Sequence, residues 1–222
     1  MTPFPFPIVG FDLDGTLLDT GDDLTAAVNH TLSLVGRPPV SRAEALSHVG
    51  GGVAQLIHRV LAATGGTDPA LEADLLPRHS EWYLAHLTDH TRPFPGAVAA
   101  LDALAARGVT LAVATNKREA ISRELLDRLG LAHYFSAVIG GDTLGPDRMK
   151  PAPDPLLEMV ARCGRGRAAF VGDSRFDVAA ARAAGMPVVA CAFGFAHEPV
   201  ETLGADAVIA HFDELVPALE RL

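Results

Sequence analysis

The stretch Ile8-Val9-Gly10-Phe11-Asp12-Leu13-Asp14-Gly15-Thr16 decides the fold. Its first four residues form a short apolar run that predicts a buried strand, and the run ends at Asp12. Asp12 and Asp14 are two residues apart, so in an extended segment their side chains point the same way. Open parallel sheets place their functional groups at the carboxyl ends of strands, so this pair of acids is a candidate site.

A helical region follows this strand. From about Asp22 to His90 the apolar residues recur at helical spacing, and no strand pattern interrupts them. Clusters of glycine and proline predict turns near residues 36–39, 50–52 and 65–69. We therefore expect about four helices, with Ser41 and Asp68 as caps near two of their starts.

Beyond Pro93-Phe94-Pro95-Gly96 the pattern becomes an alternation of helices and strands. Such alternation implies parallel strands joined by right-handed crossovers. The predicted class is α/β: a doubly wound parallel, Rossmann-like sheet with a helical cap domain inserted after the first strand. The predicted core is 1–17 with 95–222, and the predicted cap is 18–94. We expect helices at 97–106, 117–129, 154–163, 175–184 and 212–221, and strands at 109–114, 137–140, 168–171, 187–191 and 207–209.

Composition limits the classes of function. The 222 residues are 49% hydrophobic, enough for a sizeable core, and the formal net charge is −9. This charge argues against nucleic-acid and anionic-membrane surfaces as partners. Two cysteines without a CxxC pair exclude a disulfide framework and finger-type zinc, and they favour a cytoplasmic protein. The N-terminus does not read as a signal peptide, and no apolar run reaches the length of a membrane span.

Polar residues end further predicted strands. Thr115 and Asn116 follow one strand, Asp173 and Asp177 follow another, and Lys150 comes in the loop after a third. Asp173 and Asp177 are four residues apart at a helix start, so they share a face. Each acid alone is ordinary at such a position, because acids suit a helix N-terminus. Their expected convergence on one edge of the sheet makes a site.

Charge predicts a metal at this edge. Asp12, Asp14, Asp173 and Asp177 with Lys150 would leave three negative charges, which would repel any anion. A divalent cation reduces this repulsion, and oxygen ligands without His or Cys favour Mg²⁺. An EF-hand does not fit, because Leu17 stands where its loop needs glycine and a strand, not a helix, precedes the loop.

With these residues the sequence resembles the haloacid dehalogenase-like superfamily of phosphotransferases. Four motifs occur in the family's order, each at a strand end or in the loop after it: Asp12-x-Asp14-Gly15-Thr16, Thr115-Asn116, Lys150-Pro151 and Gly172-Asp173-x-x-x-Asp177. From about residue 113 to residue 192 the sequence is similar to that of the bacterial phosphoglycolate phosphatase group. Two residues depart from that group, Arg118 in place of Pro and Phe176 in place of Asn.

The resemblance implies catalytic roles. Asp12 would attack phosphorus and become an aspartyl phosphate, and Asp14 would serve as general acid and then general base. Thr115 and the amide of Asn116 would hold phosphoryl oxygens, and Lys150 would neutralise charge. Mg²⁺ would be held by Asp12, the backbone carbonyl of Asp14 and Asp173, while Asp177 would act from behind these ligands or through water.

The cap is expected to act as a lid with hinges at 17–21 and 91–95. Gly50, Gly51 and Gly52 precede a predicted helix whose free N–H groups can bind an anion. They are candidate substrate-binding residues for a carboxylate, as on 2-phosphoglycolate, although a plain flexible connection explains them equally well. The expected partner is a small phosphorylated metabolite, and the chain would be a monomer or homodimer.

Several alternatives remain at this stage. A phosphatase for pyrophosphate or another small phosphomonoester is open, and so is a sugar-phosphate mutase, although those enzymes usually carry Val at the position of Thr16. Dehalogenases lack an acid like Asp14, and phosphonate hydrolases need a lid lysine that this chain lacks. A phospho-receiver domain shares the chemistry, but it has no comparable helical insert.

Overall fold

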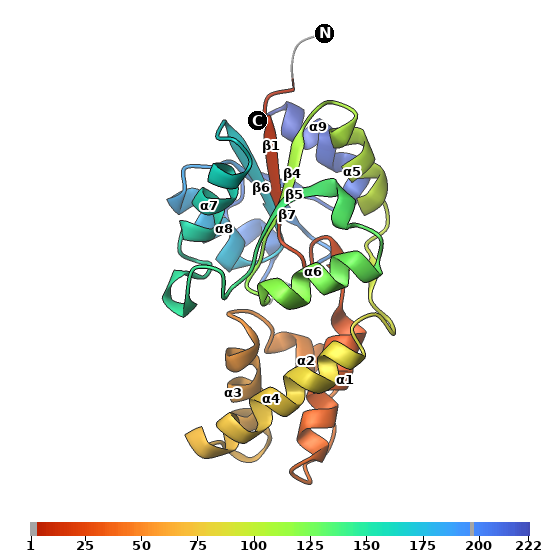
Figure 1. Ribbon diagram of the computed structural model, residues 1–222, viewed down its shortest axis with the longest axis vertical. Coiled ribbons are helices and arrows are strands. Elements are labelled where there is room, and N and C mark those ends of the chain that lie inside the picture. Colours follow the sequence, from red (N-terminus) through yellow and green to blue (C-terminus); the bar gives the residue numbers. More distant parts are fainter. Residues whose placement is uncertain (1–3, 196–197) are drawn as a thin grey trace. The chain divides into compact units, whose positions relative to one another are not determined.

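The computed structural model describes residues 4–195 and 198–222 (Figure 1). The chain divides into two compact units. One contains the chain up to Asp19 and from Pro93 onward, and the other is Thr20–Arg92. Both boundaries fall inside the segments predicted as hinges. The function of the second unit as a lid remains a prediction.

The first unit is built on a six-stranded sheet in the order β5-β4-β1-β6-β7-β8. Every neighbouring pair is parallel, and β1 lies between β4 and β6. The sheet is doubly wound, because the chain moves outward from β1 first to one side and then to the other. The strands are β1 (Ile8–Phe11), β4 (Thr110–Ala114), β5 (Phe135–Ile139), β6 (Ala168–Gly172), β7 (Val188–Cys191) and β8 (Ala207–Ile209).

Helices cover both faces of this sheet (Figure 1). α7 (Asp154–Arg162) and α8 (Arg175–Ala183) pack together on one face, and α5 (Ala97–Ala105) and α9 (Leu215–Glu220) pack together on the other. α6 (Glu119–Arg128) packs against β5. Because both faces are covered, β1, β6 and β7 are buried along their whole length and read as continuous apolar runs rather than alternating ones.

The second unit is a small helical domain. Its helices are α1 (Gly21–Ser33), α2 (Arg42–Ser47), α3 (Val53–Gly65) and α4 (Pro69–Ala85). They bury a core of their own that includes Leu32, Ile57 and Leu75. The predicted caps are confirmed: the Ser41 side chain accepts a hydrogen bond from the Glu44 amide, and Asp68 accepts two at the start of α4.

A buried carboxylate joins the two ends of the second unit. Asp23, in the first turn of α1, is 1% exposed. It accepts hydrogen bonds from the amides of His90 and Thr91 and from the Thr91 hydroxyl, at 2.7 to 3.1 Å. The entry and exit of the unit are therefore tied to one side chain.

The predicted class is confirmed, and each predicted element occurs within about two residues of its expected bounds. The last helix differs most, since a 3-10 turn, Phe212–Glu214, precedes α9. Sequence patterning missed a two-stranded sheet of β2 (Leu18–Asp19) and β3 (Arg92–Pro93), because two residues carry no periodicity. No helix of the described residues is long and apolar enough to cross a membrane.

Candidate active site

Asp12 and Asp14 stand where the central strand ends. The amide of Asp12 still bonds the carbonyl of Val171 in β6 at 2.9 Å, so the sheet fixes the position of Asp12. The chain then turns tightly, with the Leu18 amide donating to Leu13 O at 2.9 Å. Gly15 enables this turn at φ +80°, a conformation that side chains disfavour. The loop holds Asp12 as a nearly buried group and leaves Asp14 partly exposed.

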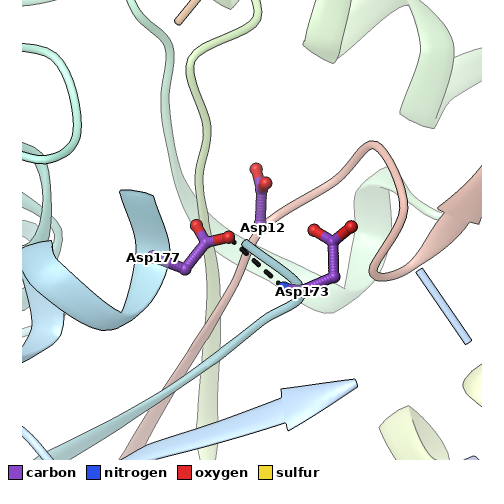
Figure 2. Close-up of side chains that lie close together, drawn as sticks. All are labelled: Asp12, Asp173 and Asp177. Carbon is purple, nitrogen blue, oxygen red and sulfur yellow. Dashed lines mark hydrogen bonds between the residues drawn. The ribbon is translucent and has the colours of Figure 1, made fainter. Parts of the chain in front are cut away.

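Asp173 and Asp177 come from the neighbouring strand and its helix. Asp173 follows β6, and Asp177 lies in the first turn of α8. Figure 2 shows the three carboxylates close together, Asp12 between Asp177 and Asp173, and the hydrogen bond from the Asp173 amide to Asp177. Asp177 also accepts from the Ser174 amide at 3.0 Å and its hydroxyl at 2.6 Å. Its carboxylate is therefore held by the backbone of the loop that carries Asp173.

Lys150 inserts its ammonium group among these acids. Its side chain is 1% exposed, and Nζ lies 2.6 Å from Asp177 Oδ1, 2.8 Å from Ala114 O and 3.0 Å from Asp12 Oδ1. The Asn116 side-chain amide bonds both the N–H and the C=O of Lys150, each at 2.9 Å. Asn116 was predicted to hold phosphoryl oxygens through its amide, and in the structure its side chain positions Lys150.

Burial and mutual repulsion shape the electrostatics. Burial raises the pKa of Asp12 to about 6, with Asp177 and Asp14 adding to the rise and Lys150 opposing it. Burial, with the charges of Asp177 and Asp12, raises the pKa of Asp173 well above its usual range. Burial disfavours the Lys150 ammonium, but Asp12 and Asp177 outweigh this and raise its pKa. Burial is thus the largest cause of both aspartate shifts, and the neighbouring acids add to each of them.

The arrangement fits a divalent cation. Oxygen atoms of Asp12, Asp173 and Asp177 lie within 4.8 Å of one another. Asp12 Oδ1 is buried and accepts no hydrogen bond from the described residues, although the Lys150 ammonium is within ion-pair distance. A hard oxygen donor set of this kind matches Mg²⁺. Both oxygens of Asp177 already accept hydrogen bonds, so its expected contribution is the indirect one.

Asp173 is held by groups that the sequence did not reveal. The Phe195 amide donates to Asp173 Oδ2 at 2.6 Å, and the Thr16 hydroxyl donates to Oδ1 at 3.2 Å. A Cβ atom on Gly194 would lie 2.3 Å from the Asp173 Cβ, and one on Gly15 would lie 2.4 Å from Oδ2. Two glycines thus let the backbone approach this carboxylate closely. The Gly194-Phe195 loop follows β7, whose end has no polar residue to draw attention to it.

Lys117 is the second residue that sequence reasoning missed. Its Nζ lies 2.9 and 3.0 Å from the two oxygens of Asp14. A signal was available, because the chain has only two lysines among 18 basic residues, and both lie at this edge of the sheet. With Lys117 included, the four acids and two lysines leave two negative charges, which one divalent cation balances.

The other predicted residues fall in two places. Thr115 is buried at the end of β4, where its hydroxyl accepts from the Lys117 amide at 3.3 Å and bonds Asp12, which lowers the Asp12 pKa. Gly50, Gly51 and Gly52 belong to the second unit, all at positive φ before α3. Arg59 donates to Gly50 O at 3.0 Å. Their role in substrate binding remains a prediction.

Arg118 and Phe176, the two residues that depart from the sequence pattern of the similar group, lie beside the site. Arg118 is exposed and pairs with Asp142 at 3.2 Å, just before α6 begins. Phe176 is half-buried in the first turn of α8, and its ring lies under the Arg175 guanidinium. Neither side chain contacts the four acids in any described interaction.

A parallel sheet whose carboxyl edge gathers acids and a buried lysine, fitted for a divalent cation, defines an α/β enzyme of the phosphoryl-transfer type. The sequence model of the haloacid dehalogenase-like hydrolase family matches residues 9–191 of this chain. The chain belongs to this family.

Individual relatives cover almost the whole chain. A phosphoglycolate phosphatase of Agrobacterium fabrum is 40% identical over 225 residues, with 99% of this chain and 95% of the relative covered. One of Cereibacter sphaeroides is 42% identical over 217 residues, covering 97% and 99%. The crystal structure of a predicted phosphoglycolate phosphatase from Haemophilus somnus superposes with a TM-score of 0.90 at 29% identity, covering 96% and 97%.

Proposed function

We propose that the chain is a Mg²⁺-dependent phosphatase that hydrolyses 2-phosphoglycolate through an aspartyl phosphate on Asp12. One observation carries this proposal: Asp12 is fixed by the central strand, with the Lys150 ammonium 3.0 Å from one oxygen and Asp173 beside it. A carboxylate placed between a cation site and an ammonium group can approach an anionic phosphoryl group without net repulsion. The relatives named phosphoglycolate phosphatase support the substrate.

Asp12, Asp173 and the backbone carbonyl of Asp14 would hold the cation, and Asp177 would keep the Asp173 loop in place. When bound, Mg²⁺ supplies Lewis-acid stabilisation of charge on the phosphoryl oxygens. Thr16 and the Phe195 amide hold Asp173 in one orientation, as partners of metal ligands commonly do.

Asp12 is the nucleophile. One of its oxygens bonds to phosphorus, the ester P–O bond breaks, and its electron pair goes to the leaving oxygen. Asp14 gives its proton to that oxygen, which releases glycolate and leaves a phosphoryl group on Asp12. Asp14 then takes a proton from water as the water attacks phosphorus, which releases phosphate and restores both carboxyl groups.

Three residues of the core hold the phosphoryl group during these steps. Lys150 balances negative charge on Asp12 and on the transferred group, and Asp177 with Ala114 O keeps its ammonium in place. The Thr115 hydroxyl and the Asn116 amide would donate to phosphoryl oxygens. In a chain that uses arginine almost everywhere else, a lysine here provides a compact charge that fits a crowded site.

A substrate panel tests the proposal. Metal-stripped protein is assayed with and without Mg²⁺ on 2-phosphoglycolate, phosphoserine, a hexose phosphate and pyrophosphate. We expect turnover only with Mg²⁺ and the highest kcat/KM on 2-phosphoglycolate. Equal rates on all four substrates would refute the substrate, and full activity in EDTA would refute the metal. A phosphate transferred to a sugar instead of water would reveal a mutase.

Asp14→Asn tests the proton transfer separately. The variant is compared on 2-phosphoglycolate, whose alkoxide leaving group needs a proton, and on p-nitrophenyl phosphate, whose leaving group does not. We expect a much larger loss of kcat on phosphoglycolate, because general acid catalysis contributes about 10²- to 10⁴-fold to such a step. Equal losses on the two substrates would remove Asp14 from this role.

A further inference from the structure

Lys117 forms an ion pair with Asp14, and the proposed catalytic steps assign no role to this lysine. It follows Thr115 and Asn116 in the loop between β4 and α6. Its Nζ lies 2.9 and 3.0 Å from the two Asp14 oxygens, so the ammonium spans the carboxylate. The backbone of Lys117 is fixed as well, since its carbonyl accepts from the Gly141 amide at 2.8 Å and its amide donates to Thr115.

This pair differs from the ordinary ion pairs of the chain. The Lys117 side chain is 7% exposed and Asp14 is 17% exposed. Pairs such as Arg78–Asp74 and Arg42–Asp22 are formed by arginine on the surface, where they contribute little. A nearly buried ammonium loses hydration, and an enclosed charge of this kind is typical of a functional site.

The position of Lys117 matches the chemistry of the leaving group. Asp14 must contact the ester oxygen in order to protonate it. In 2-phosphoglycolate a single methylene carbon separates that oxygen from the carboxylate. An ammonium that touches both Asp14 oxygens therefore lies next to the place where the substrate carboxylate must be. A hydrogen bond between two such charged groups is about twice as strong as one between neutral groups.

We propose that Lys117 recognises the substrate carboxylate and so determines specificity. The incoming carboxylate takes over one of the Lys117 hydrogen bonds, and the released oxygen of Asp14 then faces the ester oxygen. This inference rests on the proposed function and deepens it. It assigns to the core unit a task for which Gly50, Gly51 and Gly52 of the other unit were the candidates in the sequence.

The charges of the site support this assignment. Lys150 already donates to Asp177 and Ala114 O and forms an ion pair with Asp12, and all three are protein groups of the proposed phosphoryl site. Lys117, by contrast, pairs with Asp14, whose carboxyl group must exchange a proton with the ester oxygen of the substrate in the proposed reaction. A carboxylated substrate brings one more negative charge than a simple alkyl phosphate does, and the second ammonium offers a counter-charge at the right side of the site.

The test compares Lys117→Met with a matched control, Arg118→Met, whose side chain is basic, adjacent and exposed. Each is assayed on 2-phosphoglycolate, ethyl phosphate and p-nitrophenyl phosphate. Ethyl phosphate also has an alkoxide leaving group but carries a methyl group in place of the carboxylate. We expect Lys117→Met to lower kcat/KM on phosphoglycolate about tenfold or more beyond its effect on ethyl phosphate, mainly through KM. The control should keep the wild-type preference.

Three results would overturn the inference. Equal losses on phosphoglycolate and ethyl phosphate, with p-nitrophenyl phosphate spared, would make Lys117 a positioning residue for Asp14 alone. Equal losses on all three would make it structural. An unchanged preference in Lys117→Met, together with a lost preference in Gly51→Leu, would give the recognition to the glycine loop.

Two provisions keep the test decisive. Lys117→Gln keeps a donor toward Asp14 without the charge, so it replaces Lys117→Met if that variant does not fold, with the same expected change of preference. The wild type separates this inference from the proposed function: a wild type without any preference for phosphoglycolate refutes the function itself, whereas a preference that survives loss of the Lys117 charge refutes only the role of Lys117.

Discussion

Asp12 is placed where its negative charge is costly in the absence of a cation. Burial, Asp177 and Asp14 together raise its pKa to about 6 despite the nearby Lys150 ammonium. Strongly shifted pKa values of this kind are common at functional sites. The crowding that makes the charge of Asp12 unfavourable also favours binding of a cation there. Activity and stability therefore make opposite demands on this residue.

Asp12→Asn tests this opposition. The amide cannot act as nucleophile, so turnover should be lost. It also removes a charge that the metal-free fold disfavours at pH 7.5, so the metal-free variant should be more stable than wild type, by up to about 3 kcal/mol for a pKa shift of this size. Urea unfolding in EDTA measures the stability. Activity above about a hundredth of wild type, or a less stable variant, would contradict the account.

Proton competition with the metal is a second prediction for Asp12. Its folded-state pKa of about 6 lies above the unfolded value of 3.8, so the folded protein binds more protons between these values. Protonation of Asp12 should therefore contribute stability to the metal-free protein as the pH falls from about 6 toward 4, a contribution that Asp12→Asn should lack. The Mg²⁺-induced increase in Tm should be large at pH 7.5 and small at pH 5. An equal increase at both values would contradict the assignment of Asp12 as a ligand.

The loops that follow the strands, rather than the strands themselves, build the site. β1 and β6 bring Asp12 and Asp173 to one edge, and a close backbone approach at Gly15 and Gly194 then encloses Asp173. The positions of the six core strands were predictable, because each is a mostly apolar run that stops at a turn or a polar residue.

What the sequence could not supply is the pairing between loops. Asn116 bonds the backbone of Lys150, and the Phe195 amide bonds Asp173, across 34 and 22 residues of sequence. These contacts depend on the order of the strands in the sheet, which periodicity does not contain. The acids and Lys150 were predicted because their motifs are ordered along the chain. Lys117 was missed because its partner, Asp14, is 103 residues away.

Gly15→Ala tests the importance of the close approach. Its Cβ would lie 2.4 Å from Asp173 Oδ2, so Asp173 must move. We expect the Mg²⁺ concentration for half-maximal stabilisation to rise about 10- to 100-fold, as when partners of metal ligands are lost. Gly108→Ala is the control, because Gly108 has a similar φ of +73° with no atom within 4 Å. It should lose stability through backbone strain and keep its Mg²⁺ affinity. Equal changes in Mg²⁺ affinity would contradict the prediction.

At the scale of the whole molecule, the chain is an enzyme core interrupted by a helical unit with its own hydrophobic core. The interruption comes soon after β1, so the chain enters the helical unit at Thr20, a few residues beyond Asp12 and Asp14, and leaves it at Arg92. Asp23 closes the inserted unit by joining its first helix to His90 and Thr91 at its end. Each unit should therefore be perturbed separately by substitutions in its own core.

Asp23→Ala tests this independence. The variant leaves buried donors of His90 and Thr91 without an acceptor, so we expect the helical unit to lose about 2–4 kcal/mol of stability and to be cleaved faster by proteases. Mg²⁺ affinity of the core should stay unchanged. Asp22→Ala is the control, since Asp22 is exposed and bonds Arg42 on the surface. A core that loses Mg²⁺ affinity in Asp23→Ala would contradict the separation.

The central claim is that Asp12 forms a covalent intermediate, and the stereochemistry at phosphorus tests it most directly. A phosphorothioate analogue of 2-phosphoglycolate, made chiral with oxygen isotopes, is hydrolysed in isotopically labelled water. Attack by Asp12 and then by water inverts the configuration twice, so the account predicts overall retention. Inversion would show a single direct attack by water, and it would leave Asp12 as a ligand without a nucleophilic role.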